Sequence, residues 1–100
     1  MNDQAKSISA LDRVIHEPAR LMIVSLLSGI DQADFLYLLR ETGLNKGTLS
    51  SHLARLEEAG YLEITKTYRG KIPQTLLQLT ASGRNAFTQY RKTLKDAFTE

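Results

Sequence analysis

One stretch of the chain, residues 44–60, combines the side chains best suited to contact a polyanion. It reads LNKGTLSSHLARLEEAG, and Leu49, Leu53 and Leu56 recur at the spacing of one face of an α-helix. No acidic residue occurs between Asn45 and Leu56. The outer face instead carries cations, hydroxyls and an imidazole, namely Lys46, Thr48, Ser51 and Arg55, with Ser50 and His52 on its flanks. Such groups can reach base edges and phosphate oxygens, so the stretch predicts a helix that reads DNA.

The same stretch contains groups that could be mistaken for a catalytic site. Ser50, Ser51 and His52 are consecutive, and consecutive residues on a helix do not face one another, so they cannot form a nucleophile–base pair. The carboxylates of Glu57 and Glu58 point about 100° apart. The chain has neither a phosphate-binding glycine loop nor a dinucleotide fingerprint. We therefore expect no enzymatic activity and no cofactor.

Composition limits the class of protein. One hundred residues, of which 42% are hydrophobic, suffice for one domain with a single core. There is no cysteine, and the two histidines lie far apart, so we expect neither disulfides nor a metal site. No apolar run is long enough to span a membrane, and residues 1–9 are too polar for a signal peptide. These features predict a cytoplasmic protein that does not associate with membranes.

The formal charge is distributed unevenly along the chain. The total is +2, but residues 1–44 carry −2, whereas residues 45–75 and 76–100 each carry +2. The positive charge thus begins where the amphipathic stretch begins. A polyanionic partner is consistent with this distribution.

The residues on either side of the stretch complete a recognisable pattern. Gly43 can adopt positive φ and close a preceding helix, and Asn45 can cap the next one by accepting from the backbone near Thr48. This is the turn of a helix-turn-helix. After Gly60 come two predicted strands, residues 61–68 and 75–79, joined by a turn whose residues are Arg69, Gly70 and Lys71. Pro73 is expected at a strand edge or at the turn exit.

The remaining elements are predicted from apolar periodicity and punctuation. We expect a flexible lead-in at 1–9, a helix at 9–16, a helix at 18–27 that starts at Pro18 and ends at Gly29, and a helix at 35–42 capped by Asp34 or Asp31. A final helix starts at Thr80 or Ser82. The predicted division is a lead-in at 1–9, a winged-helix domain at 10–80 and a C-terminal helix at 81–100. The fold class is mainly α with a small β-hairpin wing.

This arrangement resembles the small winged helix-turn-helix transcriptional regulators of the MarR and ArsR type. The resemblance rests on residues 47–62 (GTLSSHLARLEEAGYL), on the entry helices at 10–23, and on 68–75 (YRGKIPQT) and 79–84 (LTASGR). It covers about residues 10–98 and is closest to the compact, stand-alone members.

The resemblance implies a homodimer on double-stranded operator DNA, with the recognition helix in the major groove and the wing on flanking phosphates or the minor groove. The positions that match DNA-facing residues are Lys46, Thr48, Ser50, Ser51, His52, Arg55, Arg69 and Lys71. Gly47 would let the helix N-terminus approach a phosphate. Gln74 departs from the basic residue usual beside the wing proline. The metal-responsive members' Cys- or His-rich sensor pattern is absent, and nothing marks a small-molecule effector site.

Each assignment also has a plainer alternative. The domain could be a protein-interaction module without DNA binding, although the acid-free face and the basic turn favour DNA. Arg55 could pair with Glu58, His52 could be an interfacial histidine hydrogen-bonded within the turn, and Arg69 and Lys71 could be ordinary turn residues. RNA binding is less favoured because aromatic side chains for base stacking are scarce near the turn.

The final helix carries an apolar stripe that could pack on the chain's own core or on a second protomer. Its members are Phe87, Tyr90, Leu94 and Phe98. We predict a dimer seam, because so small a monomer has little core left for a helix of aromatic side chains. A two-fold dimer would also match two operator half-sites.

Overall fold

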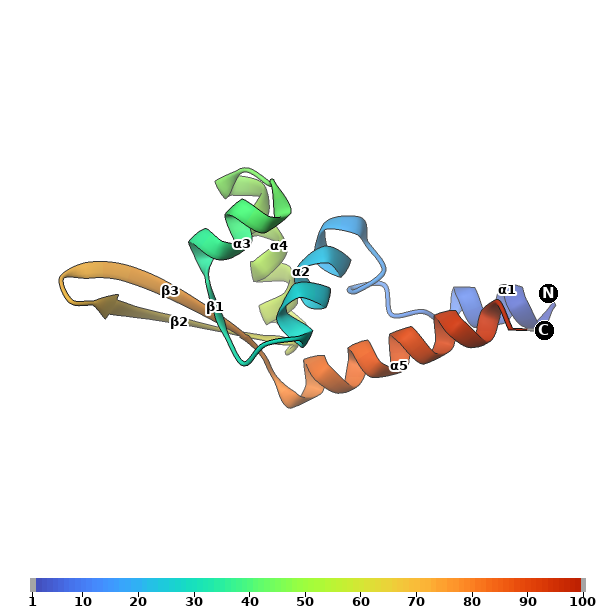
Figure 1. Cartoon of the computed structure of the whole chain (residues 1–100). Coiled ribbons are helices and arrows are strands. Elements are labelled where there is room, and N and C mark those ends of the chain that lie inside the picture. Colours follow the sequence, from blue (N-terminus) through green and yellow to red (C-terminus); the bar gives the residue numbers. More distant parts are fainter. Residues whose placement is uncertain (1, 100) are drawn as a thin grey trace.

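Five helices and a three-stranded antiparallel sheet make up the computed structural model, which describes residues 2–99 (Figure 1). The elements follow in the order α1 (Asp3–Ser9), α2 (Pro18–Ser28), β1 (Ala33–Asp34), α3 (Phe35–Thr42), α4 (Lys46–Glu58), β2 (Leu62–Arg69), β3 (Ile72–Leu79) and α5 (Ala81–Ala97). The predicted fold class is confirmed: a winged helix-turn-helix with an additional C-terminal helix.

Side-chain caps set the starts of α3 and α5 at one of the two residues that the sequence offered for each. The Asp34 carboxylate accepts from the backbone N–H of Tyr37 at 2.7 Å, so Asp34 rather than Asp31 caps α3. The Thr80 hydroxyl accepts from the backbone N–H of Gly83 at 3.0 Å, so Thr80 rather than Ser82 caps α5.

The prediction for the first helix was wrong. We expected a flexible lead-in at 1–9 and a helix at 9–16, but α1 occupies Asp3–Ser9 and residues 10–17 form turns. The Asn2 side chain caps α1, and α1 packs on α5. Asp12 accepts from the backbone N–H groups of Val14 and Ile15 at 2.8 and 3.2 Å, and such local bonds compete with a helix.

The hairpin is longer than predicted. β2 and β3 pair along their whole length, from Leu62 opposite Leu79 to Arg69 opposite Ile72. A two-residue turn joins them, in which Gly70 has φ of +66°. Pro73 lies inside β3 and not at the turn exit, so the other predicted place, a strand edge, is the one that the structure has. It is tolerated because β1 pairs with β3 only at the two residues Leu76 and Leu77, so the strand is an edge at Pro73.

The core lies where α2, α3, α4 and the base of the hairpin meet. Its fully buried side chains are Ile15, Ile23, Val24, Leu27, Leu38, Leu49, Leu56 and Leu77. The molecule is elongated, with extents of 56 × 25 × 21 Å: the hairpin projects at one end, and α1 lies with the far half of α5 at the other (Figure 1).

The start of α5 is joined tightly to the end of α4. The Thr80 backbone N–H donates to the Tyr61 carbonyl at 3.0 Å, and the Thr80 hydroxyl donates to the Gly60 carbonyl at 2.7 Å. A Cβ atom on Gly83 would lie 2.2 Å from the Tyr61 carbonyl oxygen. Only glycine therefore fits at position 83 unless the backbone moves.

We predict that Gly83→Ala lowers the free energy of unfolding by about 1–3 kcal/mol, because the backbone oxygen must be displaced. Gly47→Ala is the matched control, since Gly47 also lies in the first turn of a helix and its added Cβ would meet nothing closer than 3.6 Å. That control should be neutral or slightly stabilising. Urea denaturation at one protein concentration measures both, and equal midpoints would contradict the close-approach argument.

Candidate nucleic-acid interface

The turn between α3 and α4 sets the direction of the candidate recognition helix. Gly43 adopts the left-handed conformation with φ of +70°, and its N–H donates to the Leu39 carbonyl at 3.2 Å. The Asn45 side chain accepts from the backbone N–H of Thr48 at 2.8 Å and caps α4. Both predicted roles are confirmed. Leu44 lies half-buried between the two helices and packs against the core.

Helix α4 divides into two faces as its sequence indicates. Leu49, Leu53 and Leu56 are buried. The opposite face is exposed at Lys46, Gly47, Ser50, Ser51 and Arg55, with Thr48 half-buried. Within residues 2–99 the Arg55 guanidinium pairs with no carboxylate, so the alternative pairing with Glu58 is not formed. The Arg55 cation therefore stays available to a ligand.

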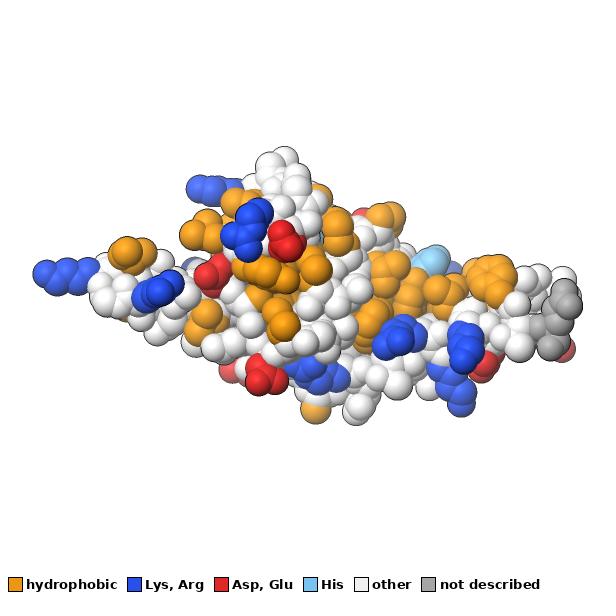
Figure 2. Space-filling model, viewed as in Figure 1, with side chains coloured by type: hydrophobic (Ala, Val, Ile, Leu, Met, Phe, Trp, Pro, Cys, Tyr) orange, Lys and Arg blue, Asp and Glu red, His pale blue; other side chains and the backbone are white. Residues whose placement is uncertain are grey.

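The hairpin supplies a second set of cations. Arg69 and Lys71 are exposed on either side of Gly70. Figure 2 shows Lys and Arg side chains at the free end of the hairpin, well away from the helical body. Gln74, where a basic residue is usual, is half-buried and lies opposite Thr67 in the sheet. Cations thus occur both on α4 and on the projecting hairpin.

His52 does not lie free on the recognition face. Its Nδ1 atom is 3.2 Å from Nη1 of Arg20 on α2 and 3.6 Å from Oε2 of Glu17. Its side chain keeps 21% of its surface exposed. The alternative of a hydrogen bond within the turn is therefore wrong, because one ring nitrogen of His52 contacts Arg20 on a different helix.

Glu17 and Arg20 are site residues that the sequence did not reveal. Glu17 could have been found as the residue before a helix-starting proline, and its carboxylate does cap α2 by accepting from Ala19 and Arg20. Burial by itself raises the pKa of the Glu17 carboxyl, but those two backbone donors and the charges of His52 and Arg20 bring the pKa below its ordinary value. No pattern in the neighbouring sequence indicates that Arg20 contacts His52, which lies 32 positions later.

The segment at 10–17 connects this cluster to the rest of the molecule. The Tyr61 hydroxyl, at the end of α4, donates to the Asp12 carboxylate. His16 Nδ1 lies 2.9 Å from the Tyr90 hydroxyl on α5. Arg20 donates to the Val14 carbonyl at 2.6 Å. The segment therefore contacts α2, α5 and the end of α4 through polar side chains.

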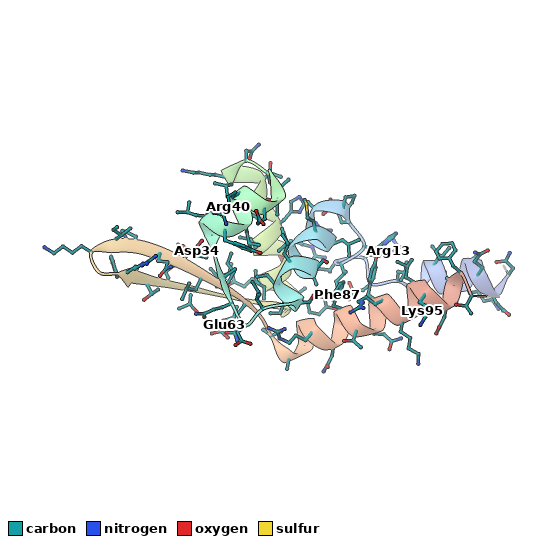
Figure 3. All side chains as sticks on the ribbon, viewed as in Figure 1. Arg13, Asp34, Arg40, Glu63, Phe87 and Lys95 are labelled. Carbon is teal, nitrogen blue, oxygen red and sulfur yellow. The ribbon has the colours of Figure 1, made fainter. Side chains whose placement is uncertain are left out.

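The apolar stripe of α5 is divided between two environments. Phe87 and Tyr90 are buried in the core of their own chain, and Leu94 is half-buried against it. For Phe87 and Tyr90 the predicted dimer seam is therefore wrong, and they pack on the chain's own core instead. Figure 3 shows Phe87 on the side of α5 that faces α2. Phe98, just beyond α5, is 65% exposed. A core-packed Phe87 and Tyr90 offer little surface to a second protomer.

A helix-turn-helix followed by a basic hairpin defines a winged-helix domain of the kind that binds DNA. The family model described as "Winged helix DNA-binding domain" matches residues 19–98. The chain belongs to that family. In the part of the chain that the structure describes, no helix is long and apolar enough to cross a membrane.

Three known proteins are similar to this chain, and the two solved structures among them are described as a transcriptional regulator homologue and a MarR-family transcriptional regulator. It is 34% identical over 79 residues to an uncharacterized protein of Methanocaldococcus jannaschii, covering 78% of this chain and 85% of that one. The structure of a transcriptional regulator homologue from Pyrococcus horikoshii superposes with a TM-score of 0.86 at 25% identity, over 95% and 93% of the two chains. A MarR-family regulator from Silicibacter pomeroyi gives 0.67 at 17% identity, over 94% and 62%. The chain has the family and fold of winged-helix DNA-binding transcriptional regulators, and solved MarR-family regulators share that fold.

The Asp12–Tyr61 contact predicts a dependence of stability on alkaline pH. The hydrogen bond to Asp12, followed by burial and the Asp12 charge, raises the pKa of Tyr61 from 10.0 to about 12. A raised pKa means that the contact stabilises the folded state fully below pH 10 and that this contribution is lost as the pH rises through about 12.

Tyr61→Phe should accordingly be less stable than the parent protein at pH 7, by about 1–2 kcal/mol. The difference should shrink as the pH rises from 10 to 12. Chemical denaturation of both proteins across this range isolates Tyr61 from other groups that titrate there. If the difference in free energy of unfolding stayed constant with pH, the hydrogen bond donated by the Tyr61 hydroxyl would contribute nothing to stability.

Proposed function

We propose that this protein is a sequence-specific DNA-binding transcriptional regulator that acts as a cytoplasmic homodimer. The observation that carries the proposal is the exposed, acid-free face of α4 together with the cations of the projecting hairpin. A duplex presents phosphates on both sides of each groove, so a protein that reads bases needs cations on both flanks. Helix α4 would enter the major groove, and Arg69 and Lys71 would contact flanking phosphates or the minor groove.

Different residues of the interface would have different tasks. Thr48, Ser51 and Arg55 lie toward the middle of the exposed face and are the candidates for base contacts. Lys46, Ser50 and the N-terminal turn at Gly47 would approach phosphates, because backbone N–H groups and the helix dipole favour an anion there. The wing cations would set the register of the protein on the duplex.

The homodimer is supported by the end of the molecule opposite the wing. No residue of α1 is buried, although the helix packs on α5. The radius of gyration is 15.1 Å, against about 13 Å for a compact domain of this length. A helix that has no buried residue is a natural contact for a second copy, and Phe98 and the half-buried Leu94 are the apolar side chains nearby on α5 and its end.

Arg55→Ala should weaken binding to the preferred duplex by about 1–3 kcal/mol and relax specificity at one base position, if the guanidinium reads a base.

Lys71→Ala should weaken all duplexes alike and reduce the slope of log affinity against log salt by about 1. The matched control is Lys95→Ala, an exposed cation on α5 far from the wing (Figure 3).

The measurement begins with selection of bound duplexes from a random pool at two salt concentrations, followed by titration of the variants. An enriched palindrome supports dimeric, site-specific binding. No enrichment would favour the alternative function, a protein-interaction module, and a Lys71→Ala variant with unchanged salt slope would remove the wing from the interface.

Phe98→Asp should convert the dimer to monomers, because a charge would enter an apolar seam, and should weaken binding to a palindromic site more than to a half-site. Leu36→Asp is the matched control, since Leu36 on α3 is 66% exposed and Phe98 is 65% exposed. Light scattering reports the mass of each variant. Equal masses for the parent and the Phe98 variant would locate any dimer contact elsewhere.

A further inference from the structure

The contact between α2 and α4 determines which nitrogen of His52 carries a proton. All the nitrogen groups of an arginine side chain are donors, so the 3.2 Å contact between Arg20 Nη1 and His52 Nδ1 requires Nδ1 to accept. Glu17 Oε2 lies farther away, at 3.6 Å, which is too long for a hydrogen bond from Nδ1. In the neutral imidazole the single proton must then reside on Nε2.

Arg20 is well placed to impose this choice, because its own position is fixed from several sides. Its Nε donates to the Val14 carbonyl at 2.6 Å and its Nη2 to the Arg13 carbonyl at 3.5 Å. Its Nη1 lies 3.8 Å from the Glu17 carboxylate, and only 17% of its side chain is exposed. Arg20 therefore presents Nη1 to Nδ1 in a defined geometry and cannot easily turn away.

The other nitrogen of His52 is open to a ligand. Every buried side-chain nitrogen or oxygen in residues 2–99 has a hydrogen-bond partner. Nε2 of His52 has no partner within those residues, so this atom is not buried and is accessible to solvent. His52 stands one helical turn after Thr48 and three residues before Arg55, at the edge of the exposed face of α4. The Nε2–H group would therefore be a donor at the rim of the recognition face.

We infer that Arg20 is a positioning residue for DNA recognition, which acts on DNA only through His52. It holds His52 as the Nε2–H tautomer, so that α4 offers a hydrogen-bond donor to an acceptor on the duplex. The acceptor is a phosphate oxygen or an acceptor atom on a base edge in the major groove. The donor role toward DNA rests on the proposed function, whereas the tautomer is a property of the free protein.

The first test is long-range ¹H–¹⁵N NMR of the imidazole nitrogens in the free protein, at a pH where both histidines are neutral. The expected result is an unprotonated Nδ1 and a protonated Nε2 at His52. His16→Gln leaves one imidazole in the chain and so assigns the signals. Arg20→Met, which keeps an apolar stem and removes the donors, should give a mixture of tautomers. A protonated Nδ1 in the parent protein would overturn the inference.

The second test compares two replacements of His52 in duplex binding. The amide of His52→Gln reaches the position of Nε2 and keeps a donor at the rim, whereas the amide of His52→Asn reaches only the position of Nδ1. We expect His52→Asn to bind roughly three- to tenfold more weakly than His52→Gln, and Arg20→Met to lose a similar factor. Equal weakening of all duplexes identifies a phosphate as the acceptor, and a changed preference at one position identifies a base.

The outcomes separate the inference from the proposed function. If the selected duplex binds and His52→Asn matches His52→Gln, the donor role is overturned while DNA binding stands. If the parent protein binds no duplex, the DNA-binding function and the donor role both fall, and the NMR result still decides whether Arg20 sets the tautomer. Arg20→Lys, which keeps one donor, should restore part of the tautomer preference lost in Arg20→Met.

Discussion

Burial of the leucine face of α4 is the interaction on which the interface depends. Each of Leu49, Leu53 and Leu56 is buried, and burying a leucine side chain contributes about 1.5–3 kcal/mol. Because a helix is rigid, fixing this face in the core fixes the opposite face toward solvent. The polar residues of α4 therefore need no contacts of their own to be held outward, which leaves Arg55 and the hydroxyl side chains free for a ligand.

The rest of the chain keeps that helix at a defined angle. Gly43 and Asn45 set the entry into α4, and the Tyr61 and Thr80 backbone contacts set the exit, where α5 approaches so closely that only Gly83 fits. The turns at 10–17 add polar contacts from the far side. The position of α4 is thus decided by packing and by backbone geometry, while the side chains on its exposed face stay available to a ligand.

The same organisation explains why the two ends of the molecule differ. The hairpin projects without a core of its own and is held together by pairing of β2 with β3 along their whole length. At the opposite end α1 packs on α5, and no residue of α1 is itself buried. Phe87 and Tyr90 belong to the core of the chain, so any seam with a second copy must lie farther along, around Leu94 and Phe98.

Local signals in the sequence determined most of the fold and most of the candidate interface. Caps, glycine turns and apolar spacing act over a few residues, and they were sufficient for α2, α3, α4, α5 and the hairpin, whose ends differed by only a few residues. The exposed cations of α4 and the wing follow from the same patterns. The first helix was misplaced because Asp12 uses its side chain to form a turn, which apolar periodicity does not reveal.

Only the tertiary structure decided the contacts between residues far apart in sequence. The partner of His52 is Arg20, the partner of Tyr61 is Asp12, and the space beside Gly83 is filled by a backbone carbonyl 22 positions earlier. The apolar spacing along α5 likewise could not show whether Phe87 faces the core or a second protomer, because both environments favour apolar side chains. Such choices depend on which surfaces meet when the elements pack, and no single stretch of the chain contains that information.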